Sequence, residues 1–162
     1  MIRLIPYLLY LWIVGMHQVF LSDVTSIYGV SINLPALMVL LVAIYKSEIT
    51  ALWFAFVVGA VAYAGLPQVM GWHVLILVVL AMAVFHFRER INMESLKAKL
   101  LLVAGGIVLD NIAVLVLSRS DGFLMLLLTK GLPGVVYTAL IAWLFFLFKE
   151  GRITLSKIKA IF

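Results

Sequence analysis

The 162-residue sequence contains no cysteine, and only 12% of its residues are charged. Without cysteine, the chain has neither a disulfide framework nor thiolate chemistry. The scarcity of charge excludes an ordinary soluble domain, in which about a quarter of the residues are charged and about half are apolar. Because 66% of the residues are hydrophobic, the lipid bilayer is the expected solvent for most of the chain.

The sequence also lacks the motifs of common catalytic sites. It has no G-x-S-x-G segment for a serine nucleophile, no glycine-rich phosphate loop, and no paired carboxylates within an apolar run. His17 and His73 fall in different apolar runs, without a His-x-x-x-His spacing, so we expect no metal. We expect no other cofactor and no enzymatic activity.

Six apolar runs are long enough to cross a bilayer, which takes roughly 20 residues as a helix. Short connections separate them, so consecutive helices should pack as antiparallel neighbours. We expect one all-α polytopic membrane domain over residues 1–162, with six transmembrane helices. The predicted spans are approximately residues 4–21, 27–45, 49–66, 69–87, 97–118 and 123–148.

Positive charges alternate with the predicted spans. Ten of the 12 Lys and Arg residues fall in the odd-numbered segments outside the membrane. Cytoplasmic loops carry an excess of Lys and Arg, so both termini should face the cytoplasm. These residues form no single stripe, so no nucleic-acid partner is expected. They are Arg3, Lys46, Arg88, Arg90, Lys97, Lys99, Lys149, Arg152, Lys157 and Lys159.

Asp110 is the one acidic residue within the apolar segment GGIVLDNIAVLVL, residues 105–117. A lone charge near the bilayer centre costs about 2.5–3.5 kcal/mol on insertion scales. At about 1.5 Å per residue, Asp110 lies roughly 12 Å and Lys130 roughly 10 Å below the outer ends of the fifth and sixth spans. A short turn joins these spans, so we expect Asp110 and Lys130 to form an ion pair.

Five further polar residues fall in the outer half of the predicted spans. A ligand pocket and a buried hydrogen-bond network would both place polar groups there, and the sequence leaves both interpretations open. The five residues are His17, Gln18, Asn33, His73 and Asn111.

Two groups of small or helix-breaking residues predict packing features. Ala51, Ala55 and Gly59 form a ridge on one face of the third span, which allows another helix to approach closely. That helix could belong to the bundle or to a partner. In the sixth span, Gly131, Pro133 and Gly134 predict a kink.

Three stretches resemble the MreD family of bacterial rod shape-determining membrane proteins. The first has a proline near the start of the second span and ends at a basic loop, the second contains spaced glycines, and the third is a proline-bearing last helix. They are LPALMVLLVAIYKS (34–47), FVVGAVAYAGLPQVMGWHVLIL (56–77) and TKGLPGVVYTALIAWLFFLF (129–148).

The second stretch both matches and departs from the family pattern. Gly59 and Gly71 keep the family's glycine spacing, but Tyr63 stands where the family tends to have an aspartate. No role of that aspartate is therefore carried over to Tyr63. Asp110 does not align with the family aspartate and inherits no role from it.

The resemblance implies a non-enzymatic membrane scaffold that regulates cell-wall elongation and rod shape from the bacterial cytoplasmic (inner) membrane. Its implied partner is an MreC-like protein with a single membrane span. Further partners would be a RodA-type glycosyltransferase, a class B penicillin-binding transpeptidase and the MreB filament. The ridge at Ala51, Ala55 and Gly59 is a candidate contact face for such a partner.

A second interpretation comes from another functional class. Six helices in a short chain, with polar groups toward the outer side, also fit the substrate-binding subunit of an energy-coupling-factor vitamin transporter. Such a subunit would bind a small molecule among the outer polar residues. It should also carry small residues along the first span, where this chain has only Gly15 within a bulky sequence.

Overall fold

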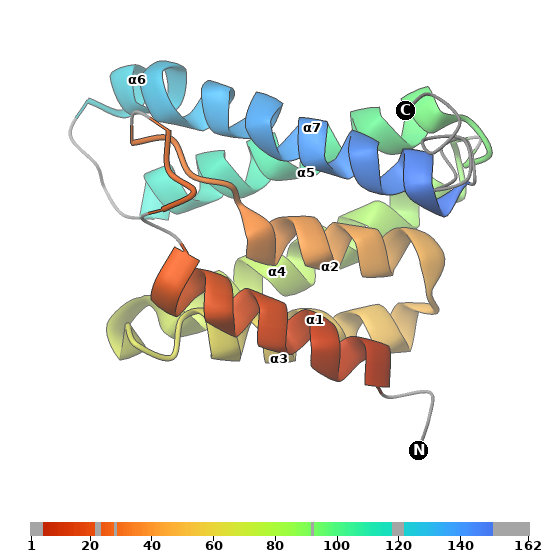
Figure 1. Cartoon of the computed structure of the whole chain (residues 1–162), viewed down its shortest axis with the longest axis horizontal. Helices are drawn as coiled ribbons and strands as arrows, with labels where there is room; N and C mark the ends of the chain where they lie inside the picture. Colours follow the sequence, from red (N-terminus) through yellow and green to blue (C-terminus); the bar gives the residue numbers. More distant parts are fainter. Residues whose placement is uncertain (1–4, 22–23, 28, 92, 118–121, 151–162) are drawn as a thin grey trace, which may run out of the picture.

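A computed structural model describes residues 5–21, 24–27, 29–91, 93–117 and 122–150. Over these residues the regular secondary structure is helical, apart from one isolated bridge between Ile27 and Val30, which confirms the predicted all-α class. The elements are α1 (Ile5–Met16), the π-helical turn η2 (His17–Leu21), α2 (Leu34–Tyr45), α3 (Glu48–Ala62), α4 (Pro67–Arg88), α5 (Leu96–Leu117), α6 (Phe123–Leu126), the π-helical turn η3 (Leu127–Gly131) and α7 (Leu132–Lys149) (Figure 1).

Three helices are long and apolar enough to cross a membrane. They are Pro67–Arg88, Leu96–Leu117 and the continuous segment Phe123–Lys149, which joins α6, η3 and α7. The other apolar helices within the described residues are shorter, at Ile5–Phe20, Leu34–Tyr45 and Glu48–Ala62. The chain therefore has the helical content of a membrane protein, with long and short helices in one bundle.

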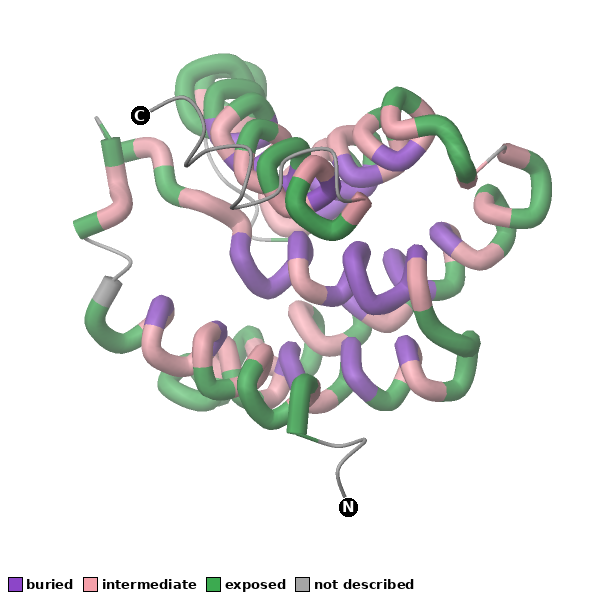
Figure 2. The backbone as a smooth tube through the Cα atoms, turned by 45° about the vertical axis from the view of Figure 1, so that its right-hand side comes forward, coloured by how far each residue is buried: buried purple, intermediate pink, exposed green. Residues whose placement is uncertain are grey.

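Helix α2 lies at the centre of the bundle. In Figure 1, α5 and α7 lie on one side of α2 and α4, and α1 and α3 lie on the other. Ten of the twelve α2 residues are buried, and Figure 2 shows this concentration of buried backbone. A helix that is apolar all round, such as LPALMVLLVAIY, is suited to that position because every face meets another helix.

Small residues let the outer helices approach one another and α2. A Cβ atom added to Gly59 would lie 2.9 Å from the backbone Cα of Val74, so α3 and α4 touch at this glycine. A Cβ on Gly106 would lie 2.7 Å from the Leu40 side chain, where α5 contacts α2. Where lipid surrounds a bundle, such close contacts supply much of the helix association.

The predicted ridge on the third span is buried inside the bundle. Ala51 and Ala55 are both 0% exposed, and Gly59 is also buried. Of the two interpretations of the ridge, this placement matches packing within the bundle. A partner's helix has no access to these residues while the bundle is intact.

The second span differs from the prediction. A helix is expected over residues 27–45, but α2 begins only at Leu34. The described residues before it include a turn closed by paired backbone hydrogen bonds between Ile27 and Val30. Pro35 and the capping residue Asn33 start a helix at this point, and Gly29 has a φ of 75°, which favours glycine. None of the described residues from 24 to 33 is buried, and irregular backbone at membrane depth requires cover from protein or water.

Candidate functional site: a polar pocket at one end of the bundle

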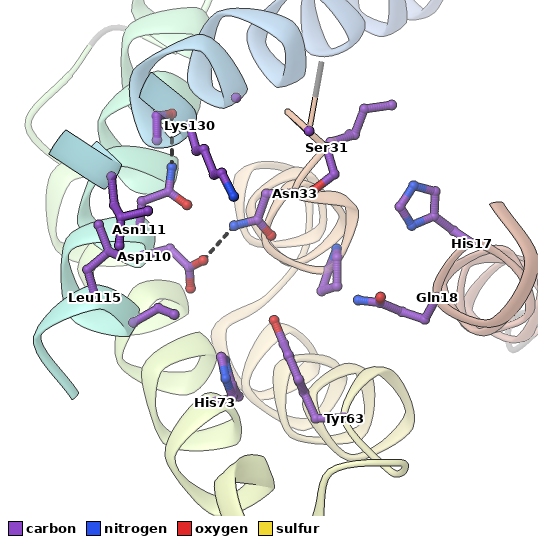
Figure 3. A pocket seen from close by; sticks show the side chains of 17 residues that line it. His17, Gln18, Ser31, Asn33, Tyr63, His73, Asp110, Asn111, Leu115 and Lys130 are labelled. Atoms are coloured by element: carbon purple, nitrogen blue, oxygen red, sulfur yellow. Dashed lines mark hydrogen bonds between the residues drawn. The ribbon is translucent and has the colours of Figure 1, made fainter. Parts of the chain in front are cut away.

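The polar pocket is a hollow of about 400 Å³ at the end of the bundle where α2 begins. It brings together the two residues of the predicted ion pair and the five further polar residues predicted in the outer half of the spans (Figure 3). They are His17, Gln18, Asn33, His73, Asp110, Asn111 and Lys130.

The pocket forms where three helical segments depart from regular α-helix. Helix α1 continues into the π-helical turn η2, which carries His17 and Gln18. The described residues before α2 are irregular up to Asn33. A longer α2 would fill the space that the pocket occupies here. The π-helical turn η3, which carries Lys130, lies between α6 and α7. Single π-helical turns recur at functional sites because they redirect side chains from the surrounding helix.

Asn33 holds three elements together through its side chain and backbone. Its Oδ1 accepts a hydrogen bond from the Ala36 backbone N–H at 3.2 Å, which caps α2. Its Nδ2 donates to Asp110 Oδ2 at 2.6 Å on α5. Its backbone N–H donates to Thr138 Oγ1 at 3.2 Å on α7. Asn33 is thus the junction at which α2, α5 and α7 are fixed relative to one another.

Asp110 is 3% exposed, and its hydrogen-bond partner is the Asn33 amide. The ion pair expected between Asp110 and Lys130 is not formed: within the described part of the chain, the one ion pair within 4.0 Å joins Lys99 and Glu150. Lys130 does line the same pocket, and its side chain extends into it from η3 (Figure 3). The two residues therefore share a pocket without a direct contact.

A second pair of hydrogen bonds supports the break in the last helical segment. Asn111 Nδ2 donates to the Gly131 carbonyl at 3.3 Å, which links α5 to η3. The buried Thr138 hydroxyl donates to the Gly134 carbonyl at 2.7 Å within α7. At the place where a kink is predicted, the structure thus has a π-helical turn, followed by Pro133 in the first turn of α7.

The two histidines occupy different parts of the pocket. His17 is 6% exposed; its Nε2 lies 3.2 Å from Thr25 Oγ1, and its Nδ1 is buried without a hydrogen-bond partner. His73 stacks on Tyr63 with ring centroids 3.7 Å apart and an interplanar angle of 10°. Across the described residues, no three His, Cys, Asp or Glu side chains are grouped as a metal site would require.

Tyr63 is a pocket residue that the sequence does not identify as one. Its ring packs on His73, and its side chain points into the pocket from the end of α3 (Figure 3). The sequence contained a signal, because Tyr63 lies in the outer half of its predicted span, as the other polar residues do. Gly131 and Gly134 also line the pocket, and a Cβ atom added to Gly134 would lie 3.5 Å from the Ser31 carbonyl oxygen.

The pocket combines one carboxylate, one ammonium group, two imidazoles, and amides. These groups supply hydrogen-bond donors and acceptors for a polar molecule or for water. Its volume falls within the range of about 300–1,000 Å³ that is typical of ligand pockets. Comparisons with family models, curated proteins and solved structures find no match for this chain.

Proposed function

We propose that this chain is a non-enzymatic membrane scaffold of the MreD type, which docks a single-span partner within the bacterial cytoplasmic membrane. The bundle would cross the membrane six times with both termini inside. The partner would be MreC-like, and the assembly would serve cell-wall elongation and rod shape.

The observation that carries this proposal is the position of the family-like residues in the fold. Pro35 lies in the first turn of α2, where a missing N–H costs nothing, and Pro133 follows the π-helical turn η3 at the start of α7. Gly59 lies where α3 meets α4 closely enough to exclude a side chain. Three residues that carry the resemblance thus occupy structural positions that suit their type.

The partner surface is expected on the outer face of α3. The ridge at Ala51, Ala55 and Gly59 points inward. On the opposite face Trp53 and Phe56 are exposed and form an edge-to-face pair with centroids 6.3 Å apart. Large aromatic side chains provide much of the binding energy at protein interfaces.

Purification from native membranes in a mild detergent tests the proposal. A single-span protein should copurify with the full-length chain, and Trp53→Leu should reduce its recovery several-fold. Trp143→Leu is the matched control, because Trp143 is an exposed tryptophan on α7. Recovery of an ATPase pair, without a single-span protein, would contradict the scaffold and favour a transporter.

The polar pocket favours a second candidate function, which is binding of a small polar molecule as the substrate-binding subunit of a vitamin transporter. The supporting observation is the gathering of seven polar residues around one hollow of about 400 Å³. Vitamin-sized compounds should then raise the unfolding temperature of the purified protein, and Asp110→Asn should reduce that shift. A broad compound set without any stabilisation would count against this candidate.

A further inference from the structure

A second hollow, of about 100 Å³, lies at the end of the bundle opposite the polar pocket. Its walls are the first turns of α1 and the last turns of α7, and its floor is the end of α2. Leu41, Val42 and Phe145 supply apolar surface, while Tyr7, Lys46 and Lys149 supply polar groups. Apolar and cationic side chains therefore meet in one small groove.

The cations of this groove are held by aromatic rings. Lys149 Nζ lies 3.8 Å from the centroid of the Tyr45 ring, and Lys46 Nζ lies 5.9 Å from that of Tyr7. Lys99, at 5.6 Å from the Tyr45 ring, is paired with Glu150. Among the described residues, no carboxylate lies within 4.0 Å of Lys46 or Lys149. The groove thus carries two positive charges without an acidic partner in the part of the chain that the structure describes.

We propose that this groove binds the phosphate of an anionic phospholipid between Lys46 and Lys149, with an acyl chain along the apolar floor. An ammonium group has three donors, so each lysine can keep its aromatic contact and still bind a phosphate oxygen. Basic pockets between transmembrane helices on the cytoplasmic side bind anionic headgroups, and the charge distribution of this chain assigns this end to the cytoplasm. The proposal is independent of the scaffold function.

The size of the groove favours a lipid over a free metabolite. A hollow of about 100 Å³ is smaller than the roughly 300–1,000 Å³ of sites that enclose a whole small molecule. A ligand that fits only one charged group into the hollow must place the rest of the molecule outside it. A phospholipid meets this condition because its chains remain in the bilayer beside α1 and α7.

Competitive lipid binding to the full-length protein in detergent, followed by native mass spectrometry, tests the proposal. With equal amounts of phosphatidylglycerol and phosphatidylcholine, phosphatidylglycerol should be retained in preference. Lys46→Gln with Lys149→Gln should weaken retention by about five-fold for each lysine, from the strength of a lysine near an anionic membrane surface. Lys149→Arg, which keeps the charge, should preserve it.

The control removes the same charge from the same end of the bundle. Arg90 and Lys97 are exposed and do not line the groove, so Arg90→Gln with Lys97→Gln should leave retention unchanged. Equal loss in both double variants would overturn the proposal in favour of general surface charge. Displacement of the lipid by millimolar inorganic phosphate would also overturn it, because the site would then bind a free anion. The single Lys46→Gln variant, at an exposed position, provides the same comparison if the double variant does not fold.

Discussion

The two ends of the bundle accommodate polar groups in different ways. At the pocket end, around Asn33, three helical segments are irregular, and a buried carboxylate is bound by a side-chain amide. At the basic end, around Lys46, Arg88, Lys99 and Lys149, the helices are regular, and cations lie against carbonyls and aromatic rings. At the pocket end the buried Asp110 thus depends on one short amide, whereas at the basic end Lys46 and Lys149 are exposed long side chains that can reach water.

Helix α2 shows the same contrast over only twelve residues. Asn33 caps its first turn at the pocket end. At its other end, Arg88 Nη1 donates to the carbonyls of Ala43, Ile44 and Lys46 at 3.1, 3.3 and 2.9 Å. A cation at a helix C-terminus also interacts favourably with the helix dipole. One short polar residue and one long charged residue therefore secure the two ends of the central helix.

The largest expected effect belongs to the pocket end. Asn33→Ala removes the cap of α2 and leaves the buried Asp110 carboxylate without its hydrogen-bond donor. The free energy of unfolding should therefore fall by about 2–4 kcal/mol. The measurement is unfolding in mixed micelles, followed by tryptophan fluorescence. Asn111→Ala is the control, because it removes one amide bond and should cost about 1 kcal/mol. An equal loss of unfolding free energy in the two variants would show that Asn33 is no more important to the fold than Asn111.

At the basic end, Arg88→Ala should lower the free energy of unfolding by about 1.5–3 kcal/mol, since a charged donor leaves three carbonyls. Arg90→Ala, at an exposed position two residues further on, should change it by less than about 0.5 kcal/mol. The same micelle assay compares the two variants. If Arg88→Ala changed the free energy of unfolding as little as Arg90→Ala, solvent would be able to replace the guanidinium at the end of α2.

Alanine substitutions at Gly59 and Gly71, the two spaced glycines of the family-like stretch, should change stability in opposite directions, although both residues lie in helices. Gly59→Ala forces α3 away from Val74 and should destabilise by about 1–3 kcal/mol. Gly71→Ala meets no heavy atom within 4 Å and should be neutral, or stabilise by up to about 1 kcal/mol through helix propensity. Similar unfolding temperatures for the two variants would contradict the close contact of α3 with α4.

The smallest expected effect concerns Lys130. A double-mutant cycle between Asp110→Asn and Lys130→Gln should give a coupling below about 0.5 kcal/mol, since the two residues make no contact. The cycle between Asp110→Asn and Asn33→Ala should give a clearly larger coupling. If exchanging the charges of Asp110 and Lys130 rescued the single variants, the two residues would be ion-paired after all.

The sequence identified the pocket residues better than their partners. Counting residues along a span gives the depth of a side chain, and the seven polar residues do gather at one level. Depth does not give the direction in which a side chain points around its helix, so matching depths suggested Lys130 rather than Asn33 as the partner of Asp110. Hydropathy likewise could not show that α2 begins at Leu34, because an apolar irregular segment and an apolar helix have the same composition.

The late start of α2 also bears on how the chain enters a membrane during synthesis. At about 1.5 Å per residue, twelve helical residues extend roughly 18 Å, which is less than the roughly 30 Å of a bilayer core. Before the later helices are made, Asn33 at the start of α2 lacks its hydrogen-bond partners Asp110 on α5 and Thr138 on α7. The second segment should therefore integrate stably only after α5 and α7 emerge, and nascent chains that end after α3 should remain extractable from the membrane.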